Sequence, residues 1–225
     1  MPAAAAVGSS RIWLSMSEKQ PIRILIADDH FLVRLGLSAL IDSEPGLSVV
    51  AEAANGLQAV ELFRQHVPDV AILDLRMPHM TGVDATRAIL KEFSDARIVV
   101  VTTYDGDEDI YRALQAGARS YVLKDAKREE LLFAVREVYA GRRHIPPAVA
   151  ARLAERFPLS DLTSRELEVL ELVVKGFSNG EVASTLKITS GTVKMHMNSV
   201  LSKLGVKGRT QAARVALQRG IVHLD

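Results

Sequence analysis

The chain has 225 residues, 48% of them hydrophobic, which exceeds one typical domain of about 100 to 200 residues and suffices for two globular cores. It contains no cysteine, which excludes disulfides, thiol catalysis and cysteine-bound metal centres, and its six histidines lack metal-ligand spacing, which argues against a transition-metal site. The net charge of +1 hides an asymmetry, because residues 160–225 hold nine Lys/Arg against six Asp/Glu, and this basic end indicates a polyanionic partner.

Residues 1–20 predict a disordered tail. No positive charge precedes the alanines at positions 3–6, and the apolar stretch at 12–14 is too short for the core of a signal peptide, so no signal peptide is expected. Met16 is an alternative start to Met1. Apolar runs elsewhere are strand-length, well below the roughly 20 residues that a membrane-spanning helix needs. We therefore expect a soluble, cytoplasmic protein with no membrane partner.

Residues 21–139 alternate β-branched runs with amphipathic stretches of helix length. Strands are predicted at residues 22–27, 48–53, 70–73, 98–102 and 120–123, and helices at 30–41, 56–65, 82–93, 107–116 and 127–139. Five βα units predict an α/β domain, a doubly wound parallel sheet with helices on both faces. Such a sheet places its functional site at the carboxyl ends of the strands.

The alternation stops near Gly141, and residues 140–159 are predicted to form a linker. Pro146 and Pro147 bar the preceding helix from continuing, and residues 148–157 predict a further helix. From residue 160 to 225 no strand pattern occurs, and helices are predicted at residues 164–175, 179–186, 191–204 and 210–219, with Thr189 and Ser190 as candidate N-caps. This region predicts a small all-α domain.

Acidic, hydroxyl and ammonium side chains lie at the ends of four of the five predicted strands. Asp28 and Asp29 follow the first strand, Asp74 the third and Lys124 the fifth, while Thr102 ends the fourth. Three clustered carboxylates need a counter-charge, which Mg²⁺ supplies because it prefers oxygen ligands. The set predicts phosphoryl transfer to Asp74, with Lys124 neutralising the transferring oxygens and Thr102 donating a hydrogen bond to the product.

The first domain resembles the receiver domain of two-component response regulators. The resemblance implies a flavodoxin-like five-stranded sheet of order 2-1-3-4-5 and a sensor histidine kinase as the phosphoryl donor. The motifs that carry it are Ile-Ala-Asp-Asp-His30, Asp74-Leu-Arg-Met-Pro78 with Gly82, Thr-Thr-Tyr104, Ala116-Gly-Ala and Tyr121-Val-Leu-Lys124.

The same resemblance implies the residue roles. Asp74 would be the phosphoryl acceptor, Asp29 a direct Mg²⁺ ligand, Asp28 a second acidic ligand acting through water, and the backbone carbonyl of Arg76 a further ligand. A switch pair would consist of a threonine, which moves toward the phosphoryl group, and Tyr121, whose ring then turns inward. Thr102 has the family's spacing from Lys124, and the adjacent Thr103 is the alternative. Pro78 and Gly82 are interpreted as turn residues of the loop after Asp74.

The second domain resembles the LuxR/NarL/FixJ class of helix-turn-helix domains. The motifs are Leu162-Thr-Ser-Arg-Glu166, Gly176-Phe-Ser-Asn179, Glu181-Val-Ala, Thr192-Val-Lys194 and Leu204-Gly-Val206 with Arg209-Thr. The helix at 191–204 would enter the major groove of promoter DNA, with its apolar side facing the core.

Six side chains are candidates for contact with DNA. Lys194, Met195 and Asn198 occupy base-facing positions, where lysine can donate to guanine, methionine can touch a thymine methyl group and asparagine can read adenine. For Met195, packing inside the domain is the alternative. The phosphate contacts are predicted at Lys203, Lys207 and Arg209.

The two resemblances together predict a phosphorylation-regulated transcription factor that is not an enzyme. By resemblance we expect the resting receiver to cover the DNA-reading helix, and phosphorylation to release it and to promote a homodimer, with the helix at 210–219 as the contact between DNA-binding domains. RNA polymerase is a further candidate partner. The main alternative is a phosphorylation-independent regulator with a vestigial receiver.

Two other classes fit less well. A haloacid dehalogenase-type phosphatase has its nucleophile in a DxD motif directly after the first strand, where this chain has adjacent Asp28 and Asp29. An autoinducer-sensing LuxR protein would lack the carboxylate set.

Overall fold

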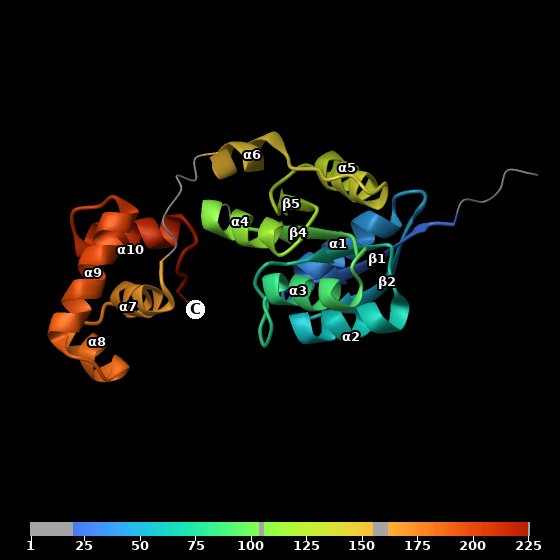
Figure 1. Cartoon of the computed structure of the whole chain (residues 1–225). Helices are drawn as coiled ribbons and strands as arrows, with labels where there is room; N and C mark the ends of the chain where they lie inside the picture. Colours follow the sequence, from blue (N-terminus) through green and yellow to red (C-terminus); the bar gives the residue numbers. More distant parts are fainter. Residues whose placement is uncertain (1–19, 104–105, 155–161, 225) are drawn as a thin grey trace, which may run out of the picture.

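The computed structural model describes residues 20–103, 106–154 and 162–224 (Figure 1). The tail predicted at residues 1–20 lies outside the described residues, apart from Gln20. So do Tyr104 of the receiver motif and the last residues, 155–157, of the predicted linker helix.

The first domain is a five-stranded parallel sheet in the order β2-β1-β3-β4-β5. This confirms the predicted fold, and each observed boundary lies within one residue of the prediction. The elements in the described part of residues 20–139 are β1 (Ile22–Ala27), α1 (Phe31–Asp42), β2 (Leu47–Ala53), α2 (Gly56–His66), β3 (Val70–Leu73), α3 (Gly82–Glu92), β4 (Ile98–Thr102), α4 (Asp107–Gln115), β5 (Ser120–Leu123) and α5 (Arg128–Tyr139).

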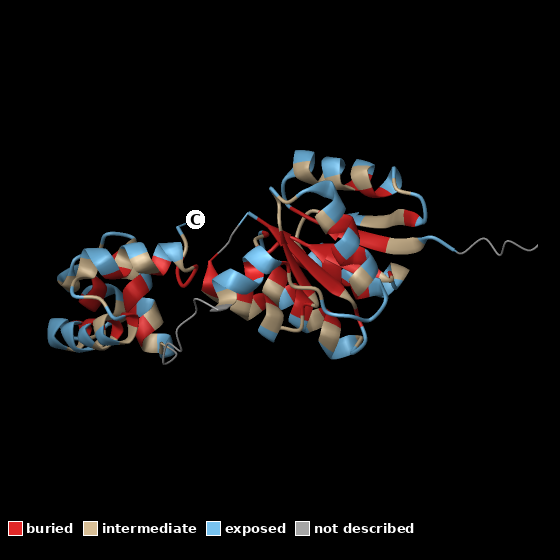
Figure 2. Cartoon of the chain, turned by 90° about the horizontal axis from the view of Figure 1, so that it is seen from above, coloured by how far each residue is buried: buried red, intermediate tan, exposed pale blue. Residues whose placement is uncertain are grey.

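Helices cover both faces of this sheet because successive strand residues point to opposite sides. In β1, Ile24 and Ile26 join the core beneath α1 and α5, whereas Leu25 and Ala27 join the core beneath α2 and α3. Figure 2 shows the sheet as a buried layer between exposed helix surfaces. Burial on both faces fixes the strand register and therefore the positions of the residues that follow the strands.

A short helix, α6 (Pro147–Ala154), follows the receiver. Pro147 is its first residue. Proline suits this position because the N–H groups of the first helical turn have no partner within the helix, so the N–H that proline lacks is not needed. Its Val149 is buried and packs in the same cluster as Ile110 of α4, so α6 is attached to the receiver.

The second domain consists, in its described residues, of α7 (Ser164–Val174), α8 (Asn179–Leu186), α9 (Ser190–Leu204) and α10 (Arg209–Gln218). Thr163 caps α7, Ser178 caps α8 and Thr189 caps α9, each side chain accepting from a backbone N–H in the first turn. The core that joins these helices includes Val169, Leu170, Val182, Val193 and Val200. Among the helices of the described ranges, none has the length and apolar character needed to cross a membrane.

Candidate phosphorylation site and DNA-reading face

The strand ends bring the predicted site residues together. The backbone N–H of Asp74 donates to the carbonyl of Ala27 at the end of β1 (2.8 Å), and the N–H of Lys124 donates to the carbonyl of Thr102 at the end of β4 (2.8 Å). The ladder of the sheet therefore continues one residue past the strands. It holds Asp74 and Lys124 at one edge of the sheet, as the sequence predicted.

Lys124 links two buried carboxylates. Its Nζ donates to Oδ2 of Asp74 (2.9 Å) and lies 2.7 Å from Oδ2 of Asp28. Burial raises the pKa of Asp74 although Lys124 opposes the shift. Burial by itself would lower the pKa of Lys124, but its bonds to Asp28 and Asp74 raise it. Oδ1 of Asp74 is buried and accepts no hydrogen bond, so this oxygen remains available for chemistry.

Asp29 completes an acidic group that includes one residue absent from the prediction, His30. Ligand atoms of Asp28, Asp29, His30 and Asp74 all lie within 4.8 Å of one another. Nδ1 of His30 is 2.8 Å from Oδ1 of Asp29, and the backbone N–H of His30 donates to Oδ1 of Asp28 (2.9 Å). Since His30 directly follows the two aspartates, its position in the sequence was the available signal.

The loop after Asp74 is shaped by a glycine. The N–H of Gly82 donates to the carbonyl of Leu75 (2.9 Å), and a Cβ at Gly82 would overlap the carbonyl oxygen of Asp74. Gly82 thus lets the start of α3 approach Asp74 closely. Arg76, whose carbonyl is the predicted further metal ligand, lies in this loop beside the site.

The predicted switch residues are both buried. Thr102 and Tyr121 are each 0% exposed, and Tyr121 packs in the cluster that contains Val100 and Ile110. The Tyr121 ring therefore points inward in this structure. Thr103 is exposed and lines the cleft over the acceptor, so the choice of Thr102 over Thr103 stays a prediction.

Asp74 opens into a cleft of about 1250 Å³ between the two domains. Asp29, Asp74 and Lys124 line its receiver side, while α7 and residues 221–224 contribute to the other side. Asp74 and the DNA-binding domain therefore face the same cleft.

The base-facing candidates share one exposed face of α9. Lys194, Met195 and Asn198 are exposed, whereas Val193 and Met197 are buried in the core. Met195 is 60% exposed, so it does not pack in the core, the alternative considered for it. The expectation that the receiver covers this helix is wrong for this structure, because the receiver docks elsewhere and leaves all three side chains accessible.

Two of the predicted phosphate contacts have partners within the protein. Nζ of Lys203 donates to Oε2 of buried Glu166 (2.7 Å), and the guanidinium of Arg209 donates to Oδ1 of Asn179 (3.0 Å) and to the carbonyl of Phe177. These bonds tie α9 to α7 and α10 to the start of α8. Lys207 is exposed.

Glu166 is a structural residue that the sequence interpretation missed. Oε1 accepts from Ser199 (2.6 Å) and Oε2 from the backbone N–H of Thr163 (2.7 Å). Burial alone would raise the pKa of Glu166, but Lys203 and Ser199 lower it to about 2. The signal was present in the sequence, because Thr163 and Glu166 form the three-residue spacing of a capping box.

Comparisons with known families identify both domains. Residues 24–136 match the response regulator receiver domain, and residues 160–216 match the bacterial regulatory proteins of the luxR family.

Individual relatives match over nearly their whole length. The chain is 40% identical to the transcriptional regulatory protein LiaR of Bacillus subtilis, over 90% of this chain and 100% of LiaR. It is 38% identical to the response regulator protein VraR of Staphylococcus epidermidis, over 89% of this chain and 99% of VraR.

Two solved structures extend the comparison. The response regulator ChrA of a heme-sensing two-component system is 39% identical, with 89% of this chain and 98% of ChrA covered and a TM-score of 0.56. The two-component response regulator RcsB in complex with DNA is 25% identical, with 88% of this chain and 99% of the RcsB chain covered and a TM-score of 0.65.

Proposed function

Because the chain belongs to the response regulators that join a receiver domain to a LuxR-type DNA-binding domain, we propose that Asp74 is the residue whose phosphorylation controls it. The protein is a two-component transcriptional regulator that binds DNA through its helix-turn-helix. The observation that carries the proposal for Asp74 is its buried Oδ1, which lacks a hydrogen-bond partner beside the Lys124 ammonium.

The residues around Asp74 fit a magnesium ion. Asp28, Asp29 and Asp74 offer carboxylate oxygens within 4.8 Å of one another, and oxygen is the ligand type that Mg²⁺ prefers. With the carbonyl of Arg76 they would hold the ion, while His30, a nitrogen donor, is better suited to orienting Asp29. Bound Mg²⁺ would neutralise negative charge on the carboxylates and on the incoming phosphoryl group.

The chain's own residues then account for the transfer. Oδ1 of Asp74 attacks the phosphorus of a phosphohistidine on the sensor kinase, an acyl phosphate bond forms, and the P–N bond breaks as the imidazole leaves. Lys124 stays near the transferring oxygens and stabilises their charge. The receiver thus assists its own modification without turning over a separate substrate.

In this proposal, Thr102 and Tyr121 transmit a conformational change from Asp74 to the rest of the receiver. The Thr102 hydroxyl moves toward the phosphoryl group, and the space it leaves secures the Tyr121 ring in the inward position that it already occupies in this structure. Such a pair is a two-state element that phosphorylation biases, as required of a site that does not itself touch DNA.

On the DNA side, the proposal gives base contacts to Lys194, Met195 and Asn198 and a phosphate contact to Lys207. Lys203 and Arg209 remain proposed phosphate contacts in addition to their bonds within the protein. Phosphorylation would promote a homodimer that pairs two reading helices on promoter DNA, where RNA polymerase is the further partner. With a kinase, DNA and polymerase as its proposed partners, the proposed location of the protein is the cytoplasm.

The test is phosphorylation of the full-length chain with acetyl phosphate and Mg²⁺, followed by intact mass. We expect one hydroxylamine-labile phosphoryl group, none in Asp74→Asn, and none when EDTA removes the metal. Unchanged labelling of Asp74→Asn would defeat the assignment. An unlabelled wild-type chain that binds DNA fully would favour the vestigial-receiver alternative.

A further inference from the structure

The segment between β1 and α1 carries two of the proposed metal ligands, Asp28 and Asp29, and a side chain of α1 reaches back to it. Nη1 of Arg34 donates to the backbone carbonyl of Asp28 (2.7 Å). The backbone N–H of Asp28 donates to the carbonyl of Ala53 at the end of β2 (3.1 Å). The backbone of Asp28 is therefore held on both sides.

The guanidinium of Arg34 is itself held in place by neighbouring side chains. Its Nε lies 3.3 Å from Oε2 of Glu52 on β2, and its carbon lies 5.7 Å from the centre of the Phe31 ring. Oε1 of Glu52 accepts from the hydroxyl of Ser38, a buried residue of α1 (2.8 Å). Arg34, Glu52 and Ser38 thus form a continuous brace between α1, β2 and the segment that follows β1.

An irregularity in β2 directs Glu52 toward α1. The pairing of β1 with β2 shifts by one residue after Ile24, where the register passes over Val50. Glu52 therefore lies opposite Ile26, whose side chain belongs to the core beneath α1 and α5. Without the shift, Glu52 would lie opposite Ala27 and point to the other face of the sheet, since strand side chains alternate.

A fixed Asp28 carbonyl also fixes the start of Asp29. The peptide group that joins the two residues is planar, so a hydrogen bond on this carbonyl sets the direction in which the backbone enters Asp29. The Asp29 carboxylate lines the cleft and pairs with the ring of His30, an exposed neighbour in the same segment. Its position therefore depends on the backbone that the brace holds.

We propose that Arg34 is a positioning residue of the metal site. By holding the peptide between Asp28 and Asp29, with Glu52 behind it, Arg34 fixes the directions of the carboxylates before the cation binds. Partners that orient metal ligands commonly contribute about 10- to 100-fold to metal affinity. This inference rests on the proposed function, because it takes Mg²⁺ beside Asp74 as the cofactor of phosphorylation.

The charge of Arg34 makes a positioning role distinguishable from a direct effect of charge. A guanidinium near a cation site repels the cation, so removing its charge alone would strengthen the binding of a divalent cation. Loss of positioning acts in the opposite direction and weakens binding. A weaker metal affinity in a variant that lacks the guanidinium therefore reports the loss of position and not the loss of charge.

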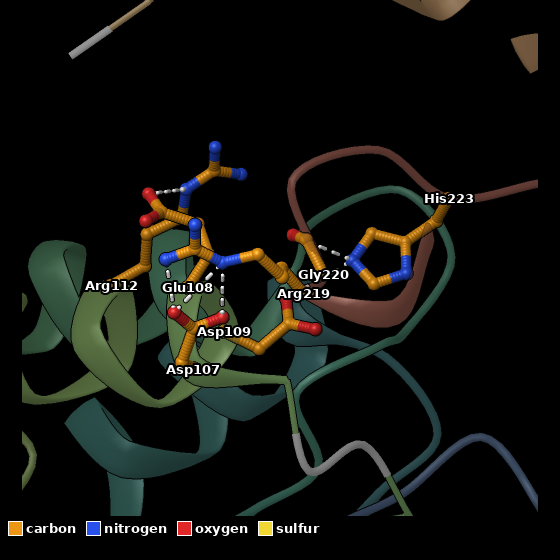
Figure 3. A network of polar contacts seen from close by, with 7 residues as sticks. All are labelled: Asp107, Glu108, Asp109, Arg112, Arg219, Gly220 and His223. Carbon is orange, nitrogen blue, oxygen red and sulfur yellow. Dashed lines mark hydrogen bonds and ion pairs between the residues drawn. The ribbon is translucent and has the colours of Figure 1, made fainter. Parts of the chain in front are cut away.

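The brace is separate from the contact between the two domains. That contact lies on α4, where Arg219 donates to Asp107 (Figure 3). Helix α4 packs in the cluster that contains Val100 of β4, whereas α1 packs in the cluster that contains the neighbouring Val99. The two helices therefore cover opposite faces of the sheet, and a change in the brace can be examined with the domains still in contact.

The first measurement is the binding of Mn²⁺ alone to the full-length chain, followed by electron paramagnetic resonance of the free ion, with Mg²⁺ as competitor. Mn²⁺ suits the probe because it accepts the same oxygen ligands. Arg34→Met should weaken the binding of both ions about tenfold. The matched control is Arg64→Met, because Arg64 joins α2 to Glu92 of α3 (2.6 Å) and neither residue is among those that line the cleft. Its metal affinity should equal that of wild type.

Arg34→Lys is the second variant, and it keeps the positive charge. Lysine has one donor group in place of the planar fork that reaches Asp28 and Glu52 together. Its metal affinity should fall by about threefold, the effect of losing one hydrogen bond of the pair. Unchanged affinity in both Arg34 variants, or a loss no greater than that of Arg64→Met, would overturn the role. If Arg34→Met does not fold, Arg34→Lys decides by the same criterion.

The second measurement is the rate of Asp74 labelling by acetyl phosphate at increasing Mg²⁺ concentration. Arg34→Met should need about tenfold more Mg²⁺ for its half-maximal rate, whereas its rate at saturating Mg²⁺ should stay within about threefold of wild type. A loss of rate that saturating Mg²⁺ does not restore would contradict a positioning role. An unlabelled wild-type chain would count against the proposed function, whereas normal labelling with unchanged metal affinity in the Arg34 variants would count against this inference alone.

Discussion

The Glu166 network offers the sharpest prediction for the DNA-binding domain. Replacing Glu166 with glutamine removes the charge that pairs with Lys203 and weakens the acceptor for Ser199. The pKa of Glu166 falls from 4.5 to about 2 in the folded chain. At about 1.4 kcal/mol for each pKa unit, the ionised carboxylate contributes about 3 kcal/mol to stability at pH 7.

The pH dependence follows from the sign of this shift. A carboxyl group whose pKa is lowered by folding stabilises the fold above its unfolded pKa, and this contribution is lost as the pH falls through 4.5 toward 2. Hydrogen exchange of the α7 amides in the full-length chain gives the opening free energy. Glu166→Gln should reduce it by about 3 kcal/mol at pH 7, and the gap from wild type should narrow by about 1 kcal/mol at pH 4.

The control is Glu168→Gln on the same helix. Glu168 forms only an exposed pair with Arg165, so its loss should change the opening free energy by less than about 1 kcal/mol. Equal effects of the two substitutions, or a Glu166 effect that does not depend on pH, would refute the reasoning.

Three further predictions concern other parts of the chain. Lys124→Met should slow phosphorylation by acetyl phosphate on the order of 10²-fold, measured by intact mass over time, and a normal rate would remove Lys124 from the site. Gly82→Ala should lower the free energy of unfolding of the receiver by about 1 to 3 kcal/mol in thermal denaturation, since its Cβ overlaps the Asp74 carbonyl, whereas Gly36→Ala, with open space around it, should not. Lys207→Met should reduce the slope of DNA affinity against salt concentration by about one, and Lys203→Met should act more on stability than on that slope.

Most of the fold could be predicted because its signals are local. Strand β3 is a short run of buried aliphatic residues, and β4 is buried along its whole length and aliphatic apart from Thr102. The phosphorylation site followed from the same pattern, because parallel strands bring Asp28, Asp74 and Lys124 to one edge regardless of their spacing in the chain. His30 was missed as a member of this group, although its position directly after the two aspartates was the available signal.

Contacts between distant residues could not be predicted in the same way. Lys203 and Arg209 look like free cations in the sequence, and only the packing of α9 and α10 against α7 and α8 gives them Glu166 and Asn179. The docking of Arg219 on Asp107 joins residues 112 positions apart. It depends on the relative placement of two domains, which no periodicity encodes.

The central claim, that a phosphoryl group on Asp74 controls DNA binding, is tested most directly by comparing DNA affinity with and without acetyl phosphate. The full-length wild type should bind promoter DNA more tightly after phosphorylation and sediment as a dimer, whereas Asp74→Asn should bind equally in both conditions. A wild-type chain that carries the phosphoryl group yet binds DNA with unchanged affinity and association state would contradict the account, as would an Asp74→Asn chain that responds like wild type.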